Sequence, residues 1–403
     1  MFDVAILGQV ALGYSPFIDR QRNVTATRLT VFALRPDEPL DAGQFLLAIG
    51  GVWPAGGARV SLNITSESLL HDLLQAGPTT NVMVEVPAFM AAEPANAEAI
   101  RRLHADGSVL LIKGRPLAEL PREVLPCFQY SIIDFHDDRR VGDGRSVPPA
   151  GVTRSIGHVQ AGVRSIAALD ESFRRGAAAA LGWPLDDLVS GPAAAGRRPG
   201  VHTDLQVIIE LIHRVDREEP IERLEQTLKR DPTLAFKLLR YINSPAFGFQ
   251  VEIGSFRHAI MMLGYQRLKR WLALLLATAS KDANLQPAMF AAVRRGLLME
   301  ELARATSDES MRNEVFICGV FSLLDHLFHE PFKDLLKTIP VPERIHAALV
   351  DGEGPYGPYL ELVRAIEAES LFDITAASER LMFSPTEINR AVLTALASAA
   401  QLG

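Results

Sequence analysis

Three basic residues beside a tryptophan form a compact charged cluster in this sequence. Arg267, Lys269 and Arg270 precede Trp271. Such a cluster could contact nucleic acid, because its charges can neutralise phosphates. On a helix the same spacing also gives a solvated basic edge, and this is the interpretation we favour. We therefore expect no nucleic-acid partner.

Residue types that ligate metals or attack substrates are scattered through the rest of the chain. His213, His258 and His346 lie on or beside apolar stripes, which is typical of packed or surface histidines. The sequence has no glycine-rich phosphate loop with the Walker spacing and no Ser-His-Asp elbow motif. Cys127 and Cys318 each lie in an apolar setting, which indicates two buried reduced thiols. We expect no cofactor.

Composition and length limit the class of protein. The 403 residues suit two or three domains, and 48% hydrophobic content is enough for substantial cores. The net charge of −7 argues against a broad surface for nucleic acid or anionic membranes. The start of the sequence has no signal-peptide pattern, and the apolar run 271–277 is far shorter than a membrane span. A cytoplasmic protein without membrane contact is expected.

The first half of the chain alternates strand and helix patterns. Glu67 to Leu74 and Asn96 to His104 are compatible with amphipathic helices. Strands separated by helices indicate a parallel sheet, here a reduced or incomplete β/α barrel of the TIM type. The expected strands are Arg59 to Ile64, Asn81 to Val86, Val109 to Lys113 and Tyr130 to Phe135.

The second half has helical patterns only. Residues 190–200 are rich in Gly, Pro and Ala and predict a linker, so the expected domains are 1–189 and 201–403. Asp231 is a good N-cap with Pro232 at the first helical position. Gly264 separates a helix beginning at Phe256 from an apolar helix over 266–279. Further expected helices span 204–215, 221–228, 287–306, 313–328, 331–337, 342–350, 357–368, 374–381 and 386–399.

The helical half resembles a family of bacterial signalling modules. The motifs that carry the resemblance are Asp231 to Asn243, Ser255 to Gly264 and the run Arg267 to Trp271. Together they are similar to the HDOD domain, an all-helical relative of the HD phosphohydrolases. The resemblance implies an HD-domain-like bundle over roughly residues 200–370.

The same resemblance implies that one metal site is lost. Where an active HD relative has adjacent His and Asp ligands, this chain has Ser322 and Leu323. Leucine cannot coordinate a metal, and serine is a poor ligand for divalent ions. Asp325 and His326 are adjacent but in reversed order, and we expect them on a solvated helix face.

The segment from Ser322 to Asp325, together with Asp351 to Gly357, looks like the subgroup in which HDOD follows a reduced EAL domain. That subgroup implies an EAL-like barrel upstream. EAL domains hydrolyse cyclic dimeric GMP with two divalent ions held by carboxylates. Pro16 to Asp19 looks like the opening motif of that family. Arg28 falls on the glutamate of the Glu-Ala-Leu motif that gives the family its name. Asn63 and Glu85 match two ligand positions.

Other positions depart from the EAL pattern. The paired aspartates fall on Lys113 and Gly114, and the catalytic lysine, two residues before Asp134, falls on Ile132. The later motif with two glutamates includes Arg164 and has neither. A like charge at 4 Å costs roughly 4 kcal/mol at an effective dielectric of 20, and about twice that against a divalent ion. We expect a metal-free pocket in which Glu85 pairs with a basic residue.

These features predict a signalling protein that is not an enzyme and acts through protein contacts. The resemblance relates it to cyclic-di-GMP signalling, with unidentified protein partners, and a homodimer is compatible with it. An alternative is a metal-independent sensor of cyclic-di-GMP or another anion, bound by Arg28, Lys113 and Arg164 if they converge. A residual phosphodiesterase is the least favoured alternative, and the residues leave nucleotide binding open.

Overall fold

The computed structural model of the chain describes residues 5–114, 116, 119–138, 156–188, 203–228, 232–243, 253, 255–305 and 308–400. The chain divides into two compact units. Met1–Asp187 and Glu361–Ala400 form the first, which we call the barrel unit. Leu188–Leu360 form the second, the helical unit. The predicted linker 190–200 and the predicted N-cap Asp231 lie outside the described residues.

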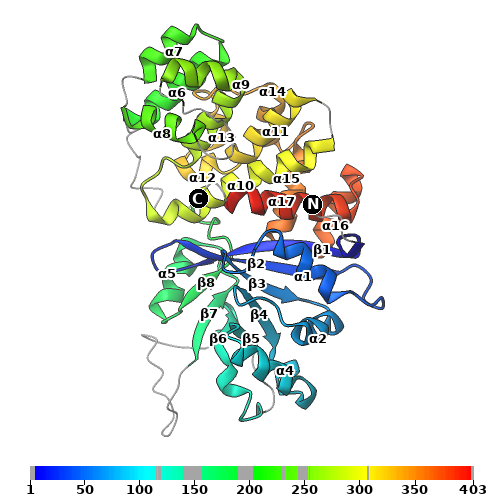
Figure 1. Cartoon of the computed structure of the whole chain (residues 1–403). Coiled ribbons are helices and arrows are strands. Elements are labelled where there is room, and N and C mark those ends of the chain that lie inside the picture. The colour runs from blue at the N-terminus through cyan, green and yellow to red at the C-terminus, as the bar shows by residue number, and fades with distance from the viewer. Residues whose placement is uncertain are drawn as a thin grey trace. The chain divides into compact units, whose positions relative to one another are not determined.

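Eight strands close into a barrel (Figure 1). The first two strands are an antiparallel hairpin, the next six run parallel to the second, and the eighth closes antiparallel against the first. The predicted β/α barrel is thus confirmed, and no strand of the eightfold ring is missing. The strands are β1 (Val10–Ile18), β2 (Val24–Ala33), β3 (Arg59–Ile64), β4 (Val82–Pro87), β5 (Leu110–Lys113), β6 (Phe128–Asp134), β7 (Gly157–Ala161) and β8 (Ala179–Leu181).

The reduction of the barrel lies in its helices. Side-chain caps start three of them, because Asp41, Ser66 and Ser165 each accept a hydrogen bond from a first-turn amide. Between β5 and β6 the described residues contain only a short 3-10 turn, η2 (Leu125–Cys127). The other elements of this part are η1 (Ala5–Gly8), α1 (Ala42–Gly50), α2 (Glu67–Ala76), α3 (Ala88–Ala92), α4 (Pro94–Ala105) and α5 (Ile166–Arg174).

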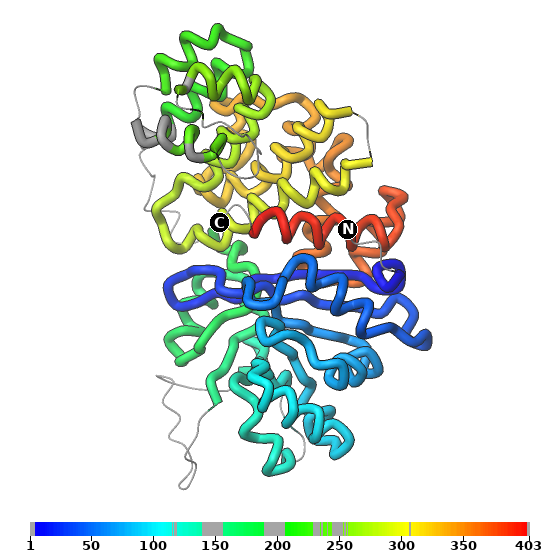
Figure 2. The backbone as a smooth tube through the Cα atoms, in the orientation of Figure 1, coloured from blue at the N-terminus to red at the C-terminus, as the bar shows by residue number. Residues whose placement is uncertain are grey.

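The last residues of the chain complete the barrel unit, which differs from the predicted domain 201–403. β8 pairs with β1 only at Phe17 and Ile18, so the earlier part of β1 has an edge without a strand partner. Residues 361–400, which we call the C-terminal segment, cover that edge with the end of α15 (Gly357–Glu367), α16 (Leu371–Leu381) and α17 (Pro385–Ala400). In Figure 2 the red end of the tube lies beside the dark blue start.

A buried asparagine explains why this association is specific. Asn389 accepts a hydrogen bond from the Leu12 amide at 3.0 Å and donates to the carbonyls of Leu7 and Val10. Its side chain is buried, so it satisfies backbone groups that an uncovered strand edge would leave without partners. The predicted boundary failed because helical periodicity shows that a segment is helical but does not show which core it joins.

The helical unit contains helices only among its described residues. Gly296 and Gly319 let α10 and α11 approach closely, since a Cβ on Gly319 would lie 2.7 Å from the Arg295 carbonyl. The helices are α6 (Thr203–Asp216), α7 (Ile221–Leu228), α8 (Pro232–Ile242), α9 (Phe256–Ala277), α10 (Gln286–Leu302), α11 (Glu309–Phe321), α12 (Leu324–Phe328), α13 (Phe332–Leu335), α14 (Glu343–His346) and the start of α15; short turns are η4 (Ala283–Leu285), η5 (Ala303–Ala305) and the π turn η6 (Ala347–Asp351).

Breaks in the helical unit occur at Gly264 and after α11. Gly264 does interrupt α9, where its backbone is non-helical with φ of 69°. The single helix predicted over 313–328 is wrong, because the chain leaves helical geometry at Ser322 and Leu323 and starts again in α12. The basic cluster is partly neutralised: Lys269 pairs with Asp216, and Arg270 with Glu300. Among the described residues, no helix has the length and apolarity to cross a membrane.

Replacing Asn389 by alanine should destabilise the barrel unit. The change leaves the Leu12 amide and two buried carbonyls without their partner, at a cost of about 2–4 kcal/mol. Urea unfolding of the full chain, followed by hydrogen exchange at barrel peptides, measures the loss. Gln75→Ala, on the exposed side of α2, is the control and should shift stability by less than about 0.5 kcal/mol. Equal stabilities for the two variants would contradict this account of the covered edge.

Candidate functional site

A polar layer lies above an apolar layer inside the barrel. The apolar cluster includes Ala26, Met83 and Leu111 from β2, β4 and β5. Two residues further along each strand stand Arg28, Glu85 and Lys113. Since strand side chains alternate between the faces, these residues point to the same interior side as the apolar ones. The layer therefore gathers charges at the carboxyl ends of parallel strands, where barrel proteins bind ligands.

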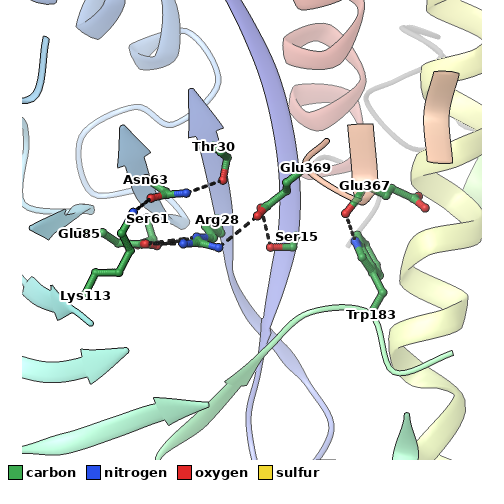
Figure 3. Close-up of polar contacts among 10 residues, drawn as sticks. All are labelled: Ser15, Arg28, Thr30, Ser61, Asn63, Glu85, Lys113, Trp183, Glu367 and Glu369. Carbon is green, nitrogen blue, oxygen red and sulfur yellow. Dashed lines mark hydrogen bonds and ion pairs between the residues drawn. The ribbon is translucent and has the colours of Figure 1, made fainter. Parts of the chain in front are cut away.

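Arg28 and Glu85 form the central pair of this layer (Figure 3). Arg28 donates from Nε and Nη2 to Glu85, at 2.9 Å to Oε1 and 2.8 Å to Oε2. Ser61 donates to Oε1 of the same carboxylate at 3.0 Å. Glu85 is only 1% exposed, so the pair is a buried, bidentate ion pair of the stronger kind. The predicted pairing of Glu85 with a basic residue is confirmed.

A second carboxylate reaches Arg28 from the far end of the sequence. Glu369, in the C-terminal segment, accepts from Arg28 Nη1 at 3.1 Å and from the Ser15 hydroxyl at 2.8 Å. Burial disfavours the charge of Arg28, but Glu85 and Glu369 outweigh burial, so the pKa of Arg28 is raised above its ordinary value. Arg28 therefore stays charged and bridges the barrel interior and the C-terminal segment.

Lys113 is the second cation of the layer. Its Nζ donates to Asn63 Oδ1 at 2.6 Å, and Asn63 Nδ2 donates to Thr30 at 3.0 Å. Burial lowers the pKa of Lys113 below 10.5, although the carboxylates of Glu85 and Glu369 oppose that shift. The layer thus combines two cations with two carboxylates.

The residues present do not fit the two metal ions that the resemblance associates with this pocket. Both oxygens of Glu85 accept from Arg28, and the amide oxygen of Asn63 accepts from an ammonium group. A pair of divalent ions needs several oxygen ligands, and two neighbouring cations oppose it. Within the described part of the chain, no group of three or more His, Cys, Asp or Glu side chains is arranged to hold a metal.

Two predicted pocket residues take no part in the hydrogen bonds of Arg28 and Lys113 in the described part of the chain. Asp134 is exposed at the end of β6 and accepts from the His136 amide at 2.9 Å. Arg164 is mostly exposed and pairs with Asp186 at 3.1 Å. The alternative that Arg28, Lys113 and Arg164 converge therefore needs correction: only Arg28 and Lys113 share the pocket.

The positions of the lost HD pair are buried in the helical unit. Ser322 donates to the Gly319 carbonyl at 2.8 Å and accepts from Arg295 Nη1 at 3.1 Å, and Leu323 packs in the core. Asp325 and His326 follow the helix break and bond to each other at 2.6 Å. Both are partly buried, so the expected solvated face is not observed. An arginine thus contacts Ser322, one of the two residues predicted to replace the HD ligands.

Several residues of the polar layer inside the barrel, called the barrel layer below, were not predicted from the sequence. Ser61 and Thr30 could have been found, because they stand two positions from Asn63 and Arg28 on the same strand faces. Ser15 directly precedes Pro16, where the motif match began. Glu369 had no local signal, since 341 positions separate it from Arg28.

Comparison with known proteins identifies a module within the helical unit. Residues 201–329 match the family model described as HDOD domain, which confirms that module. The chain is 30% identical over 165 residues to the uncharacterized protein YuxH of Bacillus subtilis, with 40% of each chain covered. It is 29% identical over 145 residues to the cyclic di-GMP phosphodiesterase CdgJ of Vibrio cholerae, covering 36% of this chain and 34% of that protein. The match thus spans well under half of either relative, and the chain is related to cyclic di-GMP signalling proteins.

Solved EAL domains are similar to the N-terminal part. The EAL domain of Mycobacterium smegmatis DcpA has a TM-score of 0.32 and 18% identity, over 43% of this chain and 90% of that one. A standalone EAL protein from Vibrio cholerae has a TM-score of 0.28 and 16% identity, over 45% of this chain and 90% of that one. The HDOD match at residues 201–329 follows the eight-stranded barrel along the chain, in the predicted order.

One prediction is contradicted by the comparison. The lost ligands led us to expect that the chain is not an enzyme, whereas the Vibrio cholerae relative is named a cyclic di-GMP phosphodiesterase. The expectation is therefore wrong as a conclusion from lost ligands. Missing ligand types describe two metal sites, and they do not determine whether the whole chain has an activity.

Removing the arginine of the central pair should destabilise the barrel unit strongly. Arg28→Met leaves Glu85 buried without its cation, at a cost of about 3–5 kcal/mol, and Glu85→Gln in the same chain should recover part of that loss. The exposed pair of Arg35 and Glu38 is the control, and Arg35→Met should cost less than about 1 kcal/mol. Urea unfolding gives all values. An Arg28→Met cost as small as that of the control would contradict the buried pair.

Lys113 should make the free energy of unfolding rise with pH in the alkaline range. Burial disfavours the charged form of Lys113 in the folded chain and lowers its pKa there. Between its lowered folded pKa and 10.5 the unfolded chain binds more protons, so stability from Lys113 rises with pH. The difference in unfolding free energy, wild type minus Lys113→Met, should therefore increase as pH rises from neutral toward 10.5. A constant difference across that window would contradict the lowered pKa.

Proposed function

We propose that this chain is a regulatory protein of cyclic di-GMP-related signalling and acts through contacts with other proteins. The observation that carries the proposal is the presence of an arginine at each pocket. Arg28 holds Glu85 in the barrel, and Arg295 holds Ser322 in the helical unit. At both positions the chain's own side chains satisfy the polar groups, which supports recognition of partners through its surfaces.

The HDOD-matched residues offer one surface suited to a protein partner. Met261 and Met262 are 63% and 42% exposed on α9, just before the interruption at Gly264. Exposed methionines are flexible and polarisable, and such side chains adapt well to apolar partner surfaces. A second copy of the chain is one candidate for the partner.

Substitution of the two methionines tests the proposal. Full-length chain with Met261→Lys and Met262→Lys should retain a co-purifying partner about ten-fold less well than wild type, because buried charges weaken an apolar contact. Leu47→Lys, which alters an exposed apolar residue on α1, is the matched control and should retain it. Light scattering on the same variants shows whether that partner is a second copy. Undiminished retention by the double variant would count against this surface.

A second candidate function is cyclic di-GMP phosphodiesterase activity, which the name of the Vibrio cholerae relative favours. In this pocket the activity would need Arg28 to leave Glu85, because both carboxylate oxygens are taken. Hydrolysis by purified chain with Mg²⁺ or Mn²⁺ tests it. A rate lost in Glu85→Gln would place the activity in the barrel layer, and an unchanged rate would place it elsewhere. No hydrolysis with either ion would remove the candidate.

A further inference from the structure

The loop between α15 and α16 places the side chain of Glu369 against the barrel layer. Glu369 has φ of 52°, in the left-handed region that side chains other than glycine rarely adopt. Residues kept in such conformations cost about 1–3 kcal/mol and concentrate at ligand clamps and switch regions. Here the Ser370 amide donates to the Ala365 carbonyl at 3.2 Å, so the conformation belongs to the cap that ends α15 and fixes where the Glu369 side chain leaves the backbone.

Several contacts hold this loop in place. Trp183 donates from its indole nitrogen to the Glu367 carbonyl at 3.1 Å, and Ser15 donates to Glu369. Gly13 on β1 makes the approach possible, since a Cβ there would lie 2.9 Å from the Ile366 carbonyl and 3.0 Å from the Glu369 Cα. The surroundings therefore determine where the Glu369 carboxylate sits (Figure 3).

The Glu369 carboxylate balances the charge of the polar layer. Arg28 and Lys113 contribute two positive charges, and Glu85 and Glu369 contribute two negative charges. Glu85 is fixed on β4, whereas Glu369 arrives with the C-terminal segment. Without Glu369 the layer would carry one uncompensated positive charge, and Arg28 Nη1 would lose its acceptor.

We propose that Glu369 is an internal competitor for an anion site, so that a phosphate group and Glu369 exclude each other at Arg28. A phosphate oxygen would accept from Arg28 Nη1 as the Glu369 carboxylate does, because guanidinium groups recognise both anions. Lys113 supplies a second positive charge, and the Ser15 hydroxyl a further donor. Release of Glu369 would also remove its bonds to Arg28 and Ser15, which would loosen the C-terminal segment from β1.

This inference goes beyond the proposed function. It concerns regulation of the barrel layer by the chain's own C-terminal segment, and it holds whether or not α9 contacts a protein. Its test measures anion binding and segment exchange, so its failure and that of the partner surface are distinguishable.

Glu369→Gln in the full chain tests the competition. Calorimetry with inorganic phosphate and with cyclic di-GMP should give binding about 5- to 150-fold tighter than to wild type, the usual range of a coupling between two sites. Glu361→Gln removes one negative charge from an exposed position of the same segment, where it pairs with Arg380, and should bind like wild type. Tighter binding of phosphate identifies a free-anion site, and tighter binding of cyclic di-GMP alone identifies a nucleotide site. Equal or absent binding in Glu369→Gln and wild type, for both probes, overturns the proposal.

Hydrogen exchange of the wild type gives a second readout that needs no variant. Saturating phosphate or cyclic di-GMP should speed exchange in α16 and α17, because a bound anion displaces Glu369. Unchanged exchange at these helices with both probes overturns the proposal even where Glu369→Gln does not fold.

Discussion

The barrel unit depends on one buried guanidinium. Arg28 donates to Glu85 inside the barrel and to Glu369 in the C-terminal segment, so one side chain joins β2, β4 and the last part of the sequence. Burying this cation is costly unless its donors are satisfied, and two carboxylates satisfy them. The same contacts decide the chemistry of the layer, because they occupy the oxygens that a metal would need.

An arginine hydrogen-bonds to a candidate site residue in each of the two units. In each, the arginine donates to a residue that we predicted to stand at a metal-ligand position: Arg28 to Glu85, and Arg295 to Ser322. A guanidinium supplies positive charge without an ion, and it fixes its partners by directional hydrogen bonds. Both units can therefore keep the architecture of their relatives while their pockets are held by protein side chains.

Much of the fold could be predicted because its signals are local. β3 matches its predicted bounds, since its apolar run is bordered by turn residues. The pairing of Glu85 followed from charge alone, and the basic residues of the layer were named correctly except Arg164. The helix break at Ser322 had no local signal, and its side chain bonds to Arg295, 27 positions away. Glu369 and Asn389 were missed for the same reason: their partners are on β1 and β2, more than 300 positions away.

The contact between Arg28 and Glu369 is the most direct test of this account. A double-mutant cycle with Arg28→Met and Glu369→Gln, measured by urea unfolding of the barrel unit in the full chain, isolates their interaction. The account predicts a coupling of more than about 1 kcal/mol, as expected for residues in one ion-pair network. Effects that add within about 0.5 kcal/mol would show that Arg28 does not hold the C-terminal segment, and would contradict the account.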